Sequence, residues 1–206
     1  MAESKYGTAA WESKWAKLTT DGESTWGPDP NLSPTGERQV ERVHQAWKAL
    51  IAKKSGVPLP QKMYCSPMRR AARTLVVTWS DILVGPNNAG LTPKFMEGIR
   101  ETVGVHTCDK RSPKSVLAAE YPTFEFEEGF TEEDEMWKAD WREAHADVDV
   151  RIRKALDEIF ATDQSTVISI TAHDGVLRSI LATVNHRPIF MPVAGVIPIL
   201  VKAQQG

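Results

Sequence analysis

Two short apolar runs in this sequence each end in polar residues of the kinds that bind anions and move protons. Residues 62–65 are followed by Ser-Pro-Met-Arg-Arg at 66–70, and residues 166–171 are followed by Ala-His-Asp-Gly at 172–175. Arginine side chains and free N–H groups at the start of a helix bind phosphate or carboxylate groups, and histidine titrates near neutral pH. If the two runs are neighbouring parallel strands, Arg70 and His173 lie at one edge of the sheet, where an anion fits between them.

Both groups also have simpler explanations. Arg69, Arg70 and Arg73 stand at helical spacing, which is typical of surface charges as much as of an anion site. Ser66 stands where an N-cap is expected, with Pro67 at the first helical position. A lone histidine is more often structural than catalytic, although the end of a strand is a place where functional groups gather. Both interpretations stay open at this point.

A carboxylic acid would complete such a site, and Glu101 is the candidate. It lies beside Arg100 in an otherwise uncharged stretch. Burial there would raise its pKa and make it a general acid, whereas periodicity alone fits a surface glutamate paired with Arg100. The sequence contains no glycine-rich phosphate loop, HExxH motif, EF-hand loop or GxSxG elbow. We therefore expect no metal and no organic cofactor.

The elements that must position these residues alternate along the chain. Apolar runs predict strands at 62–65, 166–171 and 195–202, and helical periodicity predicts helices at 35–54, 68–79, 143–160 and 175–184. Such alternation predicts an α/β three-layer sandwich, in which a mostly parallel central sheet carries helices on both faces. We expect residues 1–206 to form a single domain.

The composition limits the class of protein. The 206 residues carry a formal net charge of -2, with 41% hydrophobic and 25% charged residues. This balance is typical of a globular protein and argues against nucleic acid as a main partner. No apolar run approaches the ~20 residues of a membrane helix and the start of the chain is polar, so we expect a cytoplasmic protein without membrane contact. The two cysteines, Cys65 and Cys108, are expected to be free thiols.

Four motifs occur together in this chain: Leu-Ser-Pro-Thr-Gly-Glu-Arg-Gln at 32–39, Ser-Pro-Met-Arg-Arg at 66–70, Arg-Glu at 100–101 and Ala-His-Asp-Gly at 172–175. In order and spacing they resemble the histidine phosphatase superfamily, the phosphoglycerate-mutase-like clan. The runs at 26–30 and 104–111 resemble a branch that is common in fungi. The resemblance covers essentially the whole chain, and four motifs in register make it specific.

The resemblance implies roles for particular residues. Glu101 would donate a proton and His173 would contact the phosphoryl group, so these two are the expected catalytic residues. Asp174 stands where many members have glycine, and it would put a carboxylate beside the pocket. The residues expected to bind phosphate or a small anionic substrate are Arg70, Ser66, Asp174 and His106.

The front of the chain departs from the family pattern. Members open with a strand that ends in Arg-His-Gly, whose histidine is the nucleophile. This sequence has no Arg-His dipeptide, and residues 1–8 resemble the stretch just beyond that motif. We therefore expect a chain that is truncated at its N-terminus relative to the family, with its first strand absent and its phosphoryl transfer impaired. The other histidines offer no convincing substitute; they are His44, His106, His145 and His186.

Three functions stay open at this stage. A longer form would hydrolyse or transfer phosphomonoesters, or the chain could bind anions without transfer. It could also use Glu101 and His173 as an acid/base pair on a carboxylate substrate, with Arg70 as a clamp. No motif fixes the substrate, because specificity residues lie on loops such as 111–130. Loss of an interior strand would leave sheet edges unpaired, which predicts a homodimer.

Overall fold

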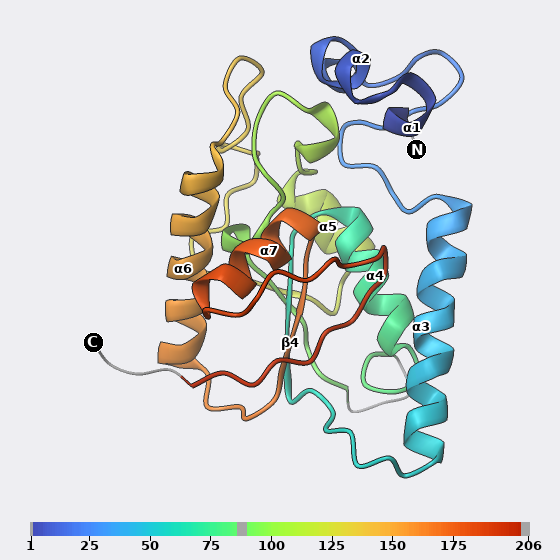
Figure 1. Ribbon diagram of the computed structural model, residues 1–206, viewed down its shortest axis with the longest axis vertical. Coiled ribbons are helices and arrows are strands. Elements are labelled where there is room, and N and C mark those ends of the chain that lie inside the picture. The colour runs from blue at the N-terminus through green and yellow to red at the C-terminus, as the bar shows by residue number, and fades with distance from the viewer. Residues whose placement is uncertain (1, 86–89, 203–206) are drawn as a thin grey trace.

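The computed structural model describes residues 2–85 and 90–202, in which helices alternate with short strands (Figure 1). The α-helices are α1 (Ala2–Tyr6), α2 (Thr8–Ser13), α3 (Pro34–Ala52), α4 (Arg69–Trp79), α5 (Lys114–Glu120), α6 (His145–Thr162) and α7 (Asp174–Thr183). The 3-10 helices are η1 (Trp15–Lys17), η2 (Glu97–Ile99) and η3 (Thr107–Asp109). The strands are β1 (Lys62–Cys65), β2 (Lys94–Phe95), β3 (Glu125–Phe126) and β4 (Ile168–Thr171).

The strands of the described residues form one parallel sheet in the order β3-β2-β1-β4. β1 lies inside this sheet, and its residues after the first are buried. β1 and β4 pair in register, with Lys62 opposite Ile168 and Cys65 opposite Thr171, so the two strands end level. The prediction that these strands are parallel neighbours is confirmed. The residues that follow them therefore start from the same edge of the sheet.

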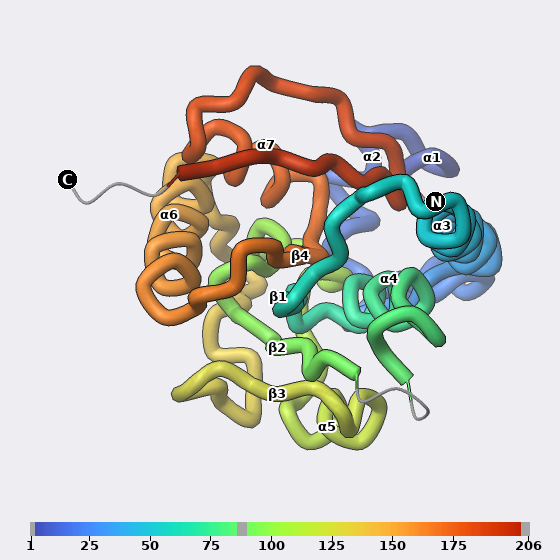
Figure 2. Tube along the Cα trace, turned by 90° about the horizontal axis from the view of Figure 1, so that it is seen from below, coloured from blue at the N-terminus to red at the C-terminus, as the bar shows by residue number. Residues whose placement is uncertain are grey.

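Helices cover both faces of the sheet, as the predicted α/β sandwich requires. α3, α4 and α5 lie on one side, and α6 and α7 lie on the other (Figure 2). Because side chains alternate along a strand, Met63 and Cys65 of β1 pack on the α4 side, whereas Tyr64 packs on the α6 side. Each face thus has its own apolar core, built around Leu75 on the α4 side and Ile152 on the α6 side.

The two long helices follow most of their predicted pattern. α6 buries Val148, Ile152 and Ile159 as its spacing predicts. α3 begins at Pro34, where the hydroxyl of Ser33 accepts a hydrogen bond from the N–H of Gly36 at 3.1 Å.

The last turn of α3 differs from the prediction, since Leu50 and Ile51 are exposed. Trp47 packs against Trp79, the last residue of α4, with ring centroids 4.7 Å apart. Leu50 and Ile51 lie beyond that contact, where α4 has ended. The apolar stripe of α3 is thus longer than the helix α4 against which it packs.

The strand predicted at 195–202 is wrong. This segment pairs with no strand of the described chain, although it crosses in front of the edge of β4 (Figure 1). Pro198 lacks the N–H group that a strand ladder needs, and Leu200 is exposed. The two-residue strands β2 and β3 are absent from the prediction, because two residues give no periodic pattern.

The N-terminal helices α1 and α2 lie beyond the carboxyl ends of the strands (Figure 1). Tyr6, Trp15 and Trp26 pack together there, and the indole N–H of Trp26 donates to the carbonyl of Leu18 at 2.8 Å. Within residues 2–85 and 90–202, no helix combines the length and the apolar content needed to cross a membrane.

Candidate functional site

The ends of β1 and β4 bring Ser66 and His173 together. The N–H of Ser66 donates to the carbonyl of Thr171 at 2.9 Å, and its buried hydroxyl lies 2.8 Å from Nε2 of His173. The prediction that Ser66 caps the following helix is wrong. α4 begins at Arg69 with Met68 in the cap position, and the Ser66 hydroxyl is directed at His173.

His173 is held in its uncharged form. Burial lowers its pKa well below the usual range, and the positive charges of Arg70, Arg100 and Arg151 lower it further. Its Nδ1 lies 3.9 Å from Oε2 of Glu101. An anion placed beside the ring would oppose this shift and draw a proton onto the imidazole.

Glu101 has the opposite shift. Burial raises its pKa, and the negative charge of Asp109 raises it further, while Arg70 and Arg142 act against the shift. Oε1 accepts a hydrogen bond from the next backbone N–H at 2.9 Å. Gly175 leaves room for the carboxyl group, since a Cβ atom there would lie 3.2 Å from Oε1. A carboxyl group with a raised pKa is suited to proton donation.

The three arginines at the start of α4 point to different partners. Arg70 turns towards the site, where Nη1 donates to the carbonyl of Cys108 at 2.8 Å and Nη2 donates to Oδ1 of Asp109 at 3.0 Å. Arg69 and Arg73 form ion pairs with glutamates of α5 and α3. Of these three arginines, only Arg70 has a positive charge that lowers the pKa values of both Glu101 and His173.

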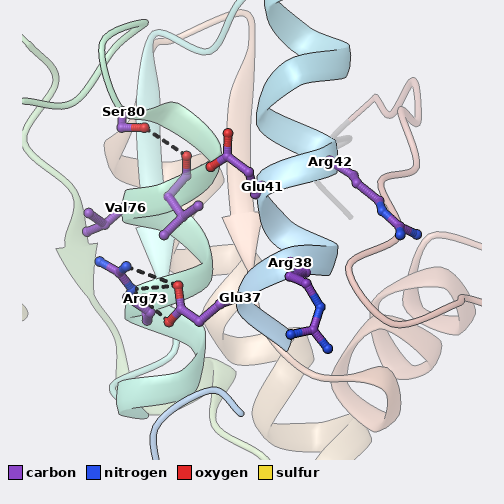
Figure 3. Close-up of a pocket in the computed structure, with 8 residues that line it drawn as sticks. Glu37, Arg38, Glu41, Arg42, Arg73, Val76 and Ser80 are labelled. Atoms are coloured by element: carbon purple, nitrogen blue, oxygen red, sulfur yellow. Dashed lines mark hydrogen bonds and ion pairs between the residues drawn. The ribbon is translucent and has the colours of Figure 1, made fainter. Parts of the chain in front are cut away.

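Two hollows in the described chain lie away from these residues. One, of about 570 Å³, lies between α3 and α4, where Arg73 turns towards Glu37 with its Nε 2.9 Å from Oε1 (Figure 3). The other, of about 460 Å³, lies between η2 and α6 and includes Glu127, whose pKa burial raises to about 7. Neither hollow is lined by Arg70 or His173. The candidate site is therefore defined by its converging polar side chains and not by either of these hollows.

Two of the predicted binding residues have partners elsewhere. Asp174, the first residue of α7, is exposed and pairs with Arg178 at 2.7 Å, one turn along the helix. His106 is buried, with Nε2 at 2.9 Å from Oε2 of Glu12 and Nδ1 at 3.8 Å from Oδ2 of Asp109. His106 therefore joins α2 to η3, which carries Asp109.

Sequence reasoning missed Asp109, Arg142 and Asp29. Asp109 is buried, and its two oxygens lie 3.0 Å from Nη2 of Arg70 and 3.4 Å from Nη1 of Arg142. Asp29 is also buried, and it fixes the start of α4 by accepting the N–H of Arg69 at 2.9 Å. A single charged residue in a loop gives no periodic signal, and the Gly-Pro-Asp-Pro run at 27–30 indicated only a turn.

Three metal-binding side-chain types also meet beside Arg70. His106, Cys108 and Asp109 hold their donor atoms within 4.8 Å of one another. The group fits a cation poorly. Burial, with the charge of Asp109, raises the pKa of Cys108 to about 12, so its thiol stays protonated, and both oxygens of Asp109 face arginines. Asp109 Oδ1 instead accepts from both Arg70 and the Cys108 thiol, and the Cys108 carbonyl accepts from Arg70.

The fold and this geometry together define a class of protein. It is an α/β protein in which an arginine, a neutral histidine and a carboxyl group of raised pKa follow the carboxyl ends of the adjacent parallel strands β1, β4 and β2. Residues 12–192 match the family profile of the Histidine phosphatase superfamily (branch 1). The chain belongs to this superfamily, which confirms the resemblance that its motifs carry.

Curated fungal relatives are similar over nearly the whole chain. The "Probable phosphoglycerate mutase" of Arthroderma benhamiae is 40% identical over 204 residues, which cover 99% of this chain and 60% of the relative. The "Probable phosphoglycerate mutase PMU1" of Saccharomyces cerevisiae is 35% identical over 202 residues, which cover 90% of this chain and 68% of the relative. The chain thus spans 60% to 68% of the length of these relatives.

A solved structure shows the same fold at low sequence identity. The ecdysone phosphate phosphatase of Bombix mori, in complex with tungstate, matches with a TM-score of 0.50 and 16% identity. The match covers 84% of this chain and 62% of that chain.

Proposed function

We propose that this chain carries a phosphomonoester-binding site of the histidine phosphatase type. Arg70 and His173 hold the phosphoryl group, and Glu101 gives a proton to the leaving oxygen. The convergence of these side chains from three separate segments of the chain is the observation that supports the proposal most. The names of the fungal relatives support a phosphomonoester as the substrate class, with hydrolysis or transfer as the reaction. A cytoplasmic location belongs to the same proposal.

The shifted pKa values suit this chemistry. The P–O bond to the leaving group breaks while phosphorus bonds to the attacking nucleophile, and the leaving oxygen needs a proton. The raised pKa of Glu101 keeps that proton available at higher pH than an ordinary carboxyl group would. The guanidinium of Arg70 balances the charge on the phosphoryl oxygens.

The nucleophile is the part of the reaction that this sequence does not supply. In the family that group is the histidine of an Arg-His-Gly motif, and the 206 residues contain no Arg-His pair. Losing a covalent nucleophile typically costs several orders of magnitude in rate. We therefore propose that this chain binds phosphomonoesters and turns them over slowly.

Binding and turnover can be measured on the same preparations. Calorimetric titration with inorganic phosphate should show binding to the wild type, and Arg70→Ala should weaken it by about tenfold or more. Arg153→Ala removes an exposed arginine of α6 and should leave the affinity unchanged. Hydrolysis of p-nitrophenyl phosphate should be slow in all three proteins.

Two results would overturn these proposals separately. Identical isotherms for the wild type and Arg70→Ala would remove the site. Rapid hydrolysis by the wild type would show that another group of this chain acts as the nucleophile, and the proposed impairment would then be wrong.

A further inference from the structure

The carboxylate of Asp109 joins two arginines from different parts of the chain. Its Oδ1 accepts from Nη2 of Arg70 at 3.0 Å, and its Oδ2 lies 3.4 Å from Nη1 of Arg142. The Asp109 side chain is 5% exposed, whereas 22% of the Arg70 side chain and 30% of the Arg142 side chain are exposed. A buried carboxylate thus fixes two guanidinium groups that both reach solvent.

Each guanidinium keeps donors for a ligand. Arg142 uses Nη1 for the carbonyls of Thr102 and Gly104 and for Asp109, and no described residue accepts a hydrogen bond from its Nε or Nη2. Arg70 uses Nη1 and Nη2, and no described residue accepts from its Nε. Since an arginine carries five N–H donors in a planar fork, both side chains retain unused donors.

Arg142 acts on the same groups as Arg70. The positive charges of both lower the pKa of Glu101 against the effect of burial, and both do the same to Cys108. Their two positive charges exceed the one negative charge of Asp109. Excess positive charge therefore remains beside the proton donor, where a phosphoryl group with two negative charges would sit.

We propose that Arg142 is a second anion-binding arginine of this site, and that Asp109 is the positioning residue that holds it beside Arg70. The ligand is the phosphoryl group of a phosphomonoester, so this inference rests on the proposed function. Arg142 lies in the loop before α6, outside the motifs at 66–70, 100–101 and 172–175.

The affinity for inorganic phosphate tests the role of Arg142. Arg142→Ala should weaken binding by roughly tenfold or more, because it removes charge-assisted hydrogen bonds. Arg142→Lys should recover part of the loss, because it keeps the charge without the planar fork. Arg153→Ala is the matched control and should bind as the wild type does.

The outcomes separate this inference from the proposed function. If Arg70→Ala loses phosphate binding while Arg142→Ala stays within about twofold of the wild type, a difference of well under 1 kcal/mol, the inference is wrong and the proposed function stands. If the wild type itself binds no phosphate, both are wrong.

A purely structural role for Arg142, through the carbonyls that it supports, is tested by NMR. The guanidinium Nε–H signal of Arg142, identified by its loss in Arg142→Lys, should shift as phosphate is added, with the dissociation constant seen by calorimetry. A signal that stays in place at saturating phosphate would contradict direct contact.

Two variants of Asp109 separate its geometry from its charge. Asp109→Asn keeps an acceptor for Arg70 and removes the charge, whereas Asp109→Ala removes both. Because positioning depends on the acceptor, Asp109→Ala should bind phosphate several-fold more weakly than Asp109→Asn. Equal affinities in the two variants would overturn the positioning role.

Discussion

Burial favours the uncharged forms of both Glu101 and His173. The raised pKa of Glu101 and the lowered pKa of His173 each disfavour the charged form, and they act in one contact pair with Nδ1 and Oε2 3.9 Å apart. Such shifts reduce folding stability in part of the pH range and prepare a carboxyl group to give a proton. This combination is typical of functional sites.

Glu101→Gln should stabilise the fold at high pH. The folded-state pKa of Glu101 is raised, so the stability of the wild type relative to this variant falls as pH rises through that pKa. We expect a gain of roughly 0.5–2 kcal/mol at pH 8 and no gain below about pH 4, measured by urea unfolding. Glu135→Gln changes an exposed glutamate and is the control. An equal gain in the control would contradict the explanation.

His173 should make the fold sensitive to acid. Below about pH 6.5 this histidine takes up a proton in the unfolded chain but resists one in the folded chain, so stability falls as pH falls. His173→Gln should reduce that loss by roughly 1 kcal/mol between pH 6.5 and 5. His145→Gln, at an exposed histidine, should leave the slope unchanged. Parallel loss in the wild type and His173→Gln would show that the folded imidazole is not held neutral.

Some of the candidate site residues could be predicted from the sequence, and others could not. Arg70, Glu101 and His173 could be predicted because each stands in a short motif that follows a strand or a turn. Asp109 and Arg142 could not, because an isolated charged residue outside a motif is assigned a role only by partners that the fold brings close.

The elements place the site through strand ends and close contacts between helices. β1 and β4 end in register, which sets Ser66 beside His173, and η2 leads directly to Glu101. η2 packs closely on α6 at Gly98, where a Cβ atom would lie 2.8 Å from the Cβ of Ala155. The position of Glu101 therefore depends on a contact that tolerates only glycine.

A double-mutant cycle tests this contact. Gly98→Ala should destabilise the fold by roughly 1–3 kcal/mol through overpacking, and Ala155→Gly should cost about 1 kcal/mol through helix propensity. The double variant should be more stable than the sum of the two losses predicts, because the second change makes room for the first. Strictly additive losses in urea unfolding would show that the two positions do not share a contact.

Whether a strand could be predicted from the sequence depended on its length and on the pattern of the residues next to it. β1 and β4, with four residues each, lie next to helical patterns and were found, whereas β2 and β3 have two residues each and were missed. The segment 195–202 is an apolar run like those of β1 and β4, yet in the described chain nothing pairs with it. An apolar run alone does not show that a partner strand exists.

On the scale of the whole molecule, β4 is an edge strand of the sheet that has the apolar side chains of an interior strand. β4 pairs with β1 on one side, and no other described strand pairs with it, although Ile168 and Ile170 are apolar and only half-buried. Unpaired N–H and C=O groups along such an edge favour pairing with another chain. Leu200 is exposed in the segment 195–202 that crosses this edge, and Phe190 is exposed in the residues just before that segment.

We propose that a second copy covers this edge through its exposed apolar segment. Sedimentation velocity should then show a dimer that increases with protein concentration, and the double variant Phe190→Lys/Leu200→Lys should shift the protein towards monomer. Val150→Lys, at an exposed valine of α6, should keep the dimer. A wild type that stays monomeric at the highest concentration reached would contradict the proposal.

The most direct test of a single anion site formed by Arg70, Glu101 and His173 is the position of tungstate in crystals of this chain. Tungstate has the shape and charge of phosphate, and its anomalous scattering locates it without ambiguity. We expect it between the guanidinium of Arg70 and the imidazole of His173, with Glu101 within hydrogen-bond distance. Tungstate bound only elsewhere, with this position empty at saturating concentration, would contradict the site.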